Sequence, residues 1–171
     1  MSELWIAIAE LPADGREFSF PERELWAGAW SALRLPGRVG EHLSAELRLT
    51  PQGRGVLVTG RLTGSVVMPC DRCCEDCPVP VDVSVDRFEE PSGDDDLEES
   101  LLREVEGELR LDAAGLLWEE LMLALPVKPL CHETCKGLCP HCGVNLNQAD
   151  CGCREESGDP RMAVFRNIKL S

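Results

Sequence analysis

Apolar and polar residues alternate along the middle of the chain in a way that predicts β-strands. Apolar side chains occupy every second position over residues 43–49, with polar side chains between them. The alternation recurs over residues 79–85, where all the apolar positions are valines. Residues 56–68, between these two segments, are rich in β-branched side chains, and Gly60 and Gly64 suit bulges or bends there. Because period-two alternation marks a half-buried strand, we predict three strands joined as an antiparallel meander.

A further strand and a helix are predicted after the meander. Residues 105–111 alternate again and predict a fourth strand. Asp112 is a candidate N-cap for a helix with an apolar face, which runs to about Leu125 and is stopped by Pro126. The sequence therefore predicts an α+β fold, an antiparallel β-meander covered by one main helix.

The first 40 residues give weaker patterns. A strand is expected within residues 4–11, and residues 21–26 predict the opening of a short helix with Ser19 as its N-cap. Residues 36–37, Pro-Gly, end that helix. The chain has four tryptophans and no tyrosine. They are scattered, without the interleaved basic residues that base-stacking sites use, and this favours packing in or beside the core.

Charge is distributed unevenly along the 171 residues, whose net charge is −14. Residues 1–127 carry 11 Lys and Arg against 26 Asp and Glu, whereas residues 128–171 carry 6 against 5. An acidic body is a poor match for nucleic-acid phosphates and a better one for a basic protein partner. Residues 86–106 contain ten acidic residues and two arginines. This segment is either a docking tail for such a partner or a solvated, mobile loop, which we place over residues 89–104.

The ten cysteines are interpreted through the compartment that the sequence indicates. The N-terminus lacks the basic start and long apolar stretch of a secretory signal, and no apolar run approaches the ~20 residues of a membrane span. We therefore expect a cytoplasmic protein with no membrane contact. Clustered cysteine pairs in a reducing cytosol hold metal more often than they form disulfides.

The second half of the chain carries a complete set of candidate zinc ligands within about fifteen residues. Cys139 and Cys142 flank a Pro-His dipeptide and are followed by Gly143, which can take a positive φ to close the turn. Cys151 and Cys153 follow and can complete a site of four thiolates. This spacing is typical of a zinc knuckle, and we predict zinc at this site.

A second zinc site is predicted from two half-sites. Cys70 and Cys73 stand between two predicted strands, and Cys131 and Cys135 precede the knuckle. Joining these four would pin the end of the chain onto the sheet. An alternative joins Cys70 and Cys73 with Cys139 and Cys142. Two cysteines are then left over, which we interpret as a small buried residue and a surface thiol respectively: Cys74 and Cys77.

The cysteine pattern favours structural zinc over catalysis. A redox CxxC usually opens a helix after a strand, but the first cluster is followed by Pro78 and a strand. A catalytic zinc keeps an open position, which four thiolates do not leave. His132 and His141 are expected to face solvent. We therefore expect no enzyme activity, no catalytic residues and no small-molecule substrate. A thiol-based redox or zinc sensor that uses Cys74 and Cys77 is the alternative function.

Several segments resemble the YceD family, the large ribosomal RNA subunit accumulation proteins of bacteria and plastids. They are residues 123–131, residues 135–147 with the string GLCPHCGVNLN, residues 151–153, the CDRC string at residues 70–73, and residues 159–165. Cys74 departs from the bulky apolar residue expected at its position. The resemblance implies a role in large-subunit ribosomal RNA accumulation or processing, and hence in ribosome assembly.

Three regions and one set of partners follow from these expectations. The regions are an acidic α+β body at 1–127, a cysteine-rich zinc-binding segment at 128–158 and a short C-terminal helix or tail at 159–171. We expect an adaptor whose acidic face holds a ribosomal protein or assembly factor with a basic surface. Its neutral end would contact large-subunit rRNA weakly or indirectly.

Overall fold

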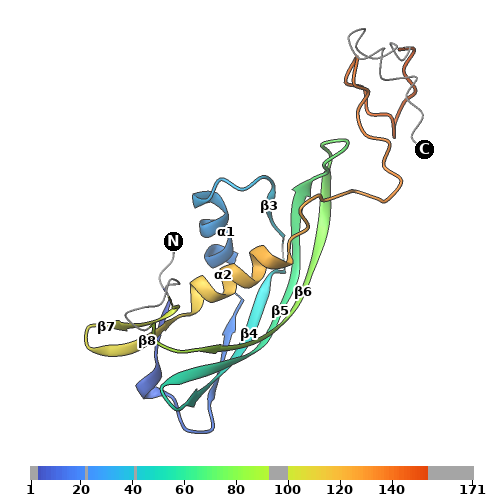
Figure 1. The fold of residues 1–171 in the computed structure, drawn as a ribbon. Helices are drawn as coiled ribbons and strands as arrows, with labels where there is room; N and C mark the ends of the chain where they lie inside the picture. The colour runs from blue at the N-terminus through green and yellow to red at the C-terminus, as the bar shows by residue number, and fades with distance from the viewer. Residues whose placement is uncertain (1–3, 22, 41, 93–99, 154–171) are drawn as a thin grey trace, which may run out of the picture.

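The computed structural model describes residues 4–21, 23–40, 42–92 and 100–153. Its spine is a long, bent hairpin of β5 (Gly55–Pro69) and β6 (Asp76–Glu89) (Figure 1). β4 (Ser44–Gln52) pairs with the other edge of β5, and β2 (Arg16–Phe20) pairs with β4. The short β3 (Arg38–Val39) pairs with β5 beyond the end of β4. All these pairings are antiparallel, so the predicted meander of three strands is confirmed as β4, β5 and β6.

Alternation of side chains holds β6 in its register. Odd-numbered residues of β6 are buried or half-buried and even-numbered residues are exposed. Pairing with β5 runs without interruption from Val56↔Glu89 to Pro69↔Asp76. The bulges that Gly60 and Gly64 suggested do not form in this ladder. A β-carbon on Gly60 would instead collide with the carbonyl oxygen of Glu46 on β4, so the missing side chain permits a close approach of strands in the bent sheet.

A second sheet has three described strands in the order β1–β8–β7. The sequence predicted one strand over residues 105–111, and this was wrong: β7 (Leu102–Val105) and β8 (Glu108–Asp112) form a hairpin. Glu106 and Gly107 make its two-residue turn with φ of 56° and 80°, the conformation that suits a tight hairpin. β1 (Trp5–Ala7) is shorter than expected because the 3-10 helix η1 (Ile8–Glu10) follows it.

Two α-helices lie within the described residues, where the sequence predicted a short helix opening at residues 21–26 and a main helix after Asp112. α2 (Ala113–Ala124) begins and ends as expected: the Asp112 carboxylate accepts a hydrogen bond of 2.9 Å from the amide of Gly115. α1 (Arg23–Ala32) is not capped by Ser19, because Ser19 belongs to β2. Neither helix is long and apolar enough to cross a membrane. The α+β class is confirmed, with two sheets and two helices.

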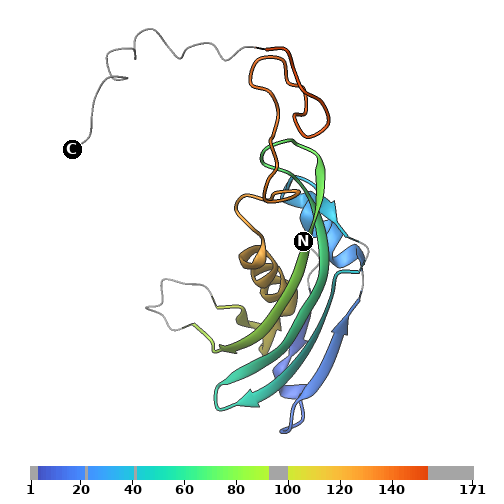
Figure 2. The same ribbon diagram turned by 90° about the vertical axis from the view of Figure 1, so that its right-hand side faces the viewer.

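The core lies between the sheets and the helices. Figure 2 shows α2 on the concave side of the bent β5–β6 hairpin. The indole rings of Trp30 and Trp118 meet edge to face at 6.3 Å and join the two helices, as expected of tryptophans that pack. Arg87 on β6 forms ion pairs of 2.8 Å with Glu119 on α2 and Glu89 on its own strand. The fully buried leucines and valines come from both layers: Leu49, Val56, Val58, Leu62, Val66, Leu111, Leu116, Leu117 and Leu121.

The chain leaves α2 and crosses to the far end of the β5–β6 hairpin, where the cysteine-rich segment lies (Figure 1). The mobile loop predicted at 89–104 is partly strand, because β6 runs to Glu89 and β7 begins at Leu102. Residues 93–99 of that loop lie outside the described residues, and so does the C-terminal helix expected at 159–171.

Candidate metal centres

The first candidate centre replaces the turn between β5 and β6. Residues 70–75 fold back on themselves: the amide of Cys70 donates to the carbonyl of Glu75, and the amide of Cys74 to the carbonyl of Cys70, both at 2.9 Å. Cys74 makes the turn with a φ of 61°, a left-handed conformation. This fold buries the side chains of Cys70 and Cys73.

Four sulfur atoms meet at this turn, from two segments about sixty residues apart in sequence. The Sγ atoms of Cys70 and Cys135 are 3.8 Å apart, and those of Cys73 and Cys131 are 3.6 Å apart. All four lie within 4.8 Å of one another. A tetrahedral ion with sulfur ligands at about 2.3 Å sets its ligands about 3.8 Å apart, so the four thiols fit a metal of that geometry. The structure thus brings together the four cysteines predicted as a second site, and not the alternative set.

Backbone contacts hold the two segments of the first centre together. The amide of Asp71 donates to the carbonyl of Pro129 at 2.8 Å. The Arg72 guanidinium donates to the carbonyl of Cys135 at 2.8 Å, and the Arg72 carbonyl accepts from the amide of Leu138 at 3.0 Å. Gly137 has a φ of 77°, and a β-carbon there would press on the Arg72 carbonyl. These contacts place the segment from Pro129 to Leu138 against the hairpin turn.

The second candidate centre is local in sequence. The Sγ atoms of its four cysteines also lie within 4.8 Å of one another: Cys139, Cys142, Cys151 and Cys153. The amide of Gly143 donates to the carbonyl of Cys139 at 2.9 Å, and the amide of Cys139 to the carbonyl of Val144 at 2.8 Å. Gly143 has a φ of 74°, the conformation expected of the glycine that closes such a turn. The donor set is again four thiols.

Asparagines support the first centre from the segment between the two cysteine pairs of the second. The Nδ2 of Asn147 donates to the Sγ of Cys135 at 3.2 Å, and its Oδ1 accepts from the amide of Lys136 at 2.8 Å. The side chains of Asn145 and Gln148 both donate to Glu75 in the hairpin turn. Sequence reasoning missed these contacts. The NLN string at 145–147 was noted only for its family resemblance, and an asparagine pair carries no metal-ligand signal of its own.

Each centre has one thiol that ionises easily and another that resists ionisation. Burial alone would raise the pKa of Cys70, but amide donors from Cys131, Arg72 and Cys73 lower it to about 6. Amides of Cys142 and His141 lower the pKa of Cys139 to about 6. Burial raises the pKa of Cys131 to about 12. The Cys153 thiol, hydrogen-bonded to Cys142, also has a pKa of about 12. Burial opposes ionisation of Cys135 as well, but the Asn147 amide and the backbone amide of Gly137 lower the pKa of this thiol.

Two cysteines outside the clusters differ from the prediction. Cys74 is exposed and Cys77 is buried, the reverse of what was expected. Cys77 lies in β6, in phase with the inward-facing valines, and packs against Cys70, Cys73 and Cys135. The period-two pattern that begins at Val79 extends back to residue 77 and could have shown this. Burial raises the pKa of the Cys77 thiol.

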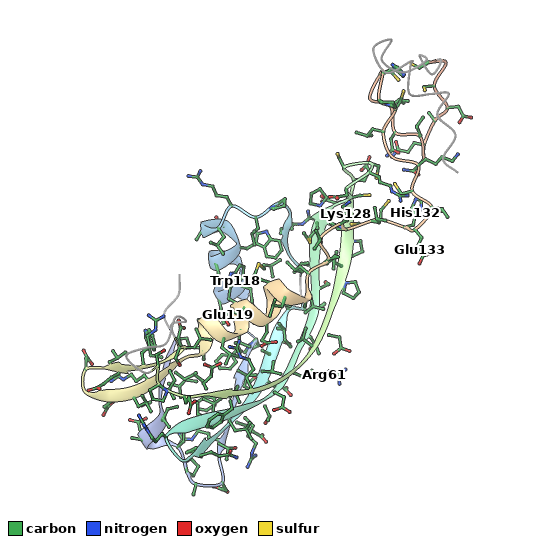
Figure 3. The ribbon with its side chains drawn as sticks, viewed as in Figure 1. Arg61, Trp118, Glu119, Lys128, His132 and Glu133 are labelled. Atoms are coloured by element: carbon green, nitrogen blue, oxygen red, sulfur yellow. The ribbon has the colours of Figure 1, made fainter. Side chains whose placement is uncertain are left out.

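Histidines take no part in either cluster. His132 and His141 are exposed, as predicted, and the Nδ1 of His132 lies 3.2 Å from the Thr134 hydroxyl. Figure 3 shows Lys128, His132 and Glu133 in the first part of the cysteine-rich segment, beside the far end of the β5–β6 hairpin.

Comparisons with known proteins place the chain in a family. The family profile described as "Large ribosomal RNA subunit accumulation protein YceD" matches residues 58–169. An uncharacterized protein of Mycobacterium tuberculosis is 34% identical over 127 residues, which is 72% of this chain and 60% of that protein. The protein YlbN of Bacillus subtilis is 26% identical over 63% of this chain and 62% of its own length. The chloroplastic YCED homolog 1 of Arabidopsis thaliana, named as a large ribosomal RNA subunit accumulation protein, is 29% identical over 34% of this chain and 18% of its own.

The chain thus spans about 60% of the length of the mycobacterial relative that it matches. No solved structure matches it. The family profile covers β5 from Val58 onwards, all of β6 and all eight clustered cysteines. That match extends over more than half of the sequence, and the chain belongs to the YceD family of large ribosomal RNA subunit accumulation proteins.

Proposed function

We propose that this protein is a non-enzymatic zinc-binding factor that supports large-subunit ribosomal RNA accumulation and ribosome assembly in the cytoplasm. Membership of the YceD family supports the ribosomal role. The convergence of eight cysteines into two sets of four, each within 4.8 Å, carries the zinc-binding part. Zn²⁺ is the ion that all-thiolate tetrahedral sites favour in a reducing compartment.

A structural role for zinc agrees with the donor sets. Four thiolates fill a tetrahedron and leave no position for a substrate or a water nucleophile. The first centre would fasten the 128–158 segment to the β5–β6 hairpin, and the second would shape the knuckle itself. We propose that zinc organises the cysteine-rich end as a binding surface beside the acidic body of residues 1–127.

An adaptor role follows from the charge distribution. The body has far more acidic than basic residues, whereas residues 128–171 are nearly neutral. An acidic surface attracts the basic ribosomal proteins and assembly factors that accompany rRNA. We propose that the body holds such a partner, and that the cysteine-rich end contacts protein, or rRNA weakly or indirectly.

Complementation in a strain that lacks this gene tests the proposal. The readout is the ratio of large-subunit to small-subunit rRNA, together with ribosome profiles on a gradient. A Cys139→Ser, Cys142→Ser variant should fail to restore the ratio, and Cys74→Ser, an exposed thiol outside both clusters, should restore it. Full complementation by the double variant would show that the second centre is not needed for the function. An unchanged rRNA ratio in the strain without the gene would remove the ribosomal role.

The redox or zinc sensor remains the second candidate because Cys74 presents an exposed thiol directly beside Cys73. Cys77, the second thiol that a sensor would use, is poorly placed for reaction with Cys74. It is buried, and its raised pKa disfavours the reactive thiolate. A sensor would release zinc and form a disulfide at low peroxide doses, and Cys74→Ser would block that release. Zinc retention at such doses by the unaltered protein would exclude it.

A further inference from the structure

β6 forms one edge of the larger sheet along its whole length. It pairs with β5 on one side, and no other described strand pairs with it. Figures 1 and 2 show it at the border of the bent hairpin. A long edge strand presents a row of backbone amides and carbonyls, which another chain can extend unless the edge is blocked.

The prolines of β6 show which backbone groups face outward. Pro78 pairs with Val67 and Pro80 with Ser65. Because proline has no N–H, Pro78 and Pro80 belong to the non-hydrogen-bonded pairs of the ladder. The backbone N–H and C=O groups of the other even-numbered residues of β6 therefore also point away from β5. The Ser65 carbonyl confirms this phase, since it accepts from the amide of Gly40 on the β3 side.

The edge is therefore blocked at one end and open at the other. Pro78 and Pro80 remove donors near the cysteine clusters. Towards the other end, the amides and carbonyls of Asp82, Ser84, Asp86 and Phe88 point outward, and these four residues are exposed. Among the described residues, no backbone group outside β5 forms a hydrogen bond with the backbone of these four residues.

The chemistry along the open part selects for a basic partner. Asp86 forms no ion pair within the described residues, whereas Asp82 is paired with Arg61 at 2.6 Å. The same strand leads into residues 86–106, with ten acidic residues against two arginines. Phe88, whose side chain is 50% exposed, offers an apolar contact at the C-terminal end of β6. A second copy of this chain would set like charges against each other, and a basic strand would not.

We propose that the edge of β6 at residues 82–88 binds an extended, basic segment of a partner protein by β-strand addition. This inference rests on the adaptor role in the proposed function and names the surface for it. The acidic side chains repel acidic strands, and the open backbone groups give the partner its main-chain hydrogen bonds. The prolines stop the added strand before it reaches the zinc-binding end.

A peptide of about eight residues with alternating lysine and valine is the probe, labelled for fluorescence anisotropy. The test variant is Ser84→Pro, which removes one outward N–H at a position in phase with Pro78 and Pro80 and so leaves the β5 ladder intact. Ser84→Ala is its matched control, since it keeps the N–H. We expect Ser84→Pro to weaken binding about tenfold or more, and Ser84→Ala to leave it unchanged.

Charge and backbone contributions separate in the same assay. Asp86→Lys should weaken binding and reduce its salt dependence. The probe with methylated backbone nitrogens on one edge should not bind. If Ser84→Pro binds the probe as tightly as the unaltered protein, or if the methylated probe binds as tightly as the unmethylated one, the interaction is charge attraction alone and the proposal is overturned. Absence of binding to the unaltered protein would also overturn it. A homodimer that Ser84→Pro dissociates would assign the edge to a second copy instead.

The outcome is independent of the zinc proposal. Zinc content and circular dichroism of the Ser84→Pro protein report whether it is folded and loaded. Loss of peptide binding with zinc intact supports the edge alone. Failure of the zinc-ligand variants in cells, with normal peptide binding, would leave the edge proposal standing.

Discussion

The Asn147 amide donates to the Cys135 sulfur at 3.2 Å, and this contact joins the knuckle segment to the first thiol cluster. A hydrogen bond to a thiolate stabilises its negative charge and orients it towards a metal. It also lowers the pKa of Cys135 against the opposing effect of burial. Asn147 is thus a side chain of the knuckle segment that directly contacts a sulfur of the first cluster.

Replacement of Asn147 by Ala should weaken zinc binding at the first centre about 10- to 100-fold, the usual effect of losing a contact to a metal ligand. Competition with a chromophoric chelator measures it. Gln148→Ala is the matched control, because that amide contacts Glu75 and no sulfur. Equal affinities for both variants would show that the Asn147 contact plays no part in metal binding.

Metal content of protein purified without chelator should be two zinc ions per chain. Cys139→Ser with Cys142→Ser should reduce it to one, and so should Cys70→Ser with Cys73→Ser, because the clusters share no ligand. Atomic absorption gives the zinc content per chain, and thiol titration gives the number of free thiols. One zinc in the unaltered protein would confine metal to a single cluster, and none with intact thiols would remove zinc altogether.

Removal of zinc should loosen the cysteine-rich end and leave the α+β body folded. The core of the body is built from leucines and valines of both sheets and α2, and it forms a cluster separate from that of the cysteines. Hydrogen exchange after chelation should therefore rise at residues 70–75 and 131–147, with no change in β4 or α2. Unfolding of the body on chelation would show that the first centre is essential to its stability.

Zinc affinity should rise with pH, because binding expels thiol protons. Near pH 7 the thiols of Cys70 and Cys139, with pKa values of about 6, are already ionised. Cys131 and Cys153, with pKa values of about 12, still hold their protons. Binding should thus release protons at pH 7, including those of Cys131 and Cys153, and acidification should weaken it further. Calorimetry in buffers of different ionisation enthalpy counts the protons, and a release near zero would contradict this titration order.

Leu117→Ala should reduce the free energy of unfolding by about 2–5 kcal/mol, since it leaves a cavity in a fully buried site. Leu123→Ala on the same helix removes the same atoms from a side chain that is 82% exposed. It should cost less than about 0.5 kcal/mol. Urea unfolding curves give both values. Similar losses would mean that Leu123 is covered in solution, for example by a partner or a second copy.

The parts of the fold that depend on local sequence were predictable. The β4–β6 meander follows from alternation, and α2 begins and ends where Asp112 and Pro126 indicate. The β7–β8 hairpin was not predicted because its turn needs a positive φ at Glu106, a residue type that does not indicate this conformation. The second sheet depends on pairing between β1 and β8, about a hundred residues apart, which alternation cannot assign.

The candidate centres were predictable to a similar extent. Counting half-sites paired Cys70 and Cys73 with Cys131 and Cys135, and the structure places their sulfur atoms together. The hydrogen bond from Asn147 to Cys135 could not be predicted from the sequence, because it depends on the conformation of the turn between the two cysteine pairs of the second centre. The burial of Cys77 was within reach, since it continues the inward phase of β6.

The two centres differ in what must happen before each can form. The knuckle gathers its ligands from residues 139–153, so it can assemble as soon as that short stretch exists. The first centre needs the turn between β5 and β6 as well as cysteines that follow α2, and so it closes a loop of 58 residues between Cys73 and Cys131. An unfolded chain can fill the knuckle, whereas only a chain whose sheet has already formed can fill the first centre. Occupancy of that centre, measured during refolding by spectroscopy with Co²⁺ in place of zinc, would then act as a readout of correct folding.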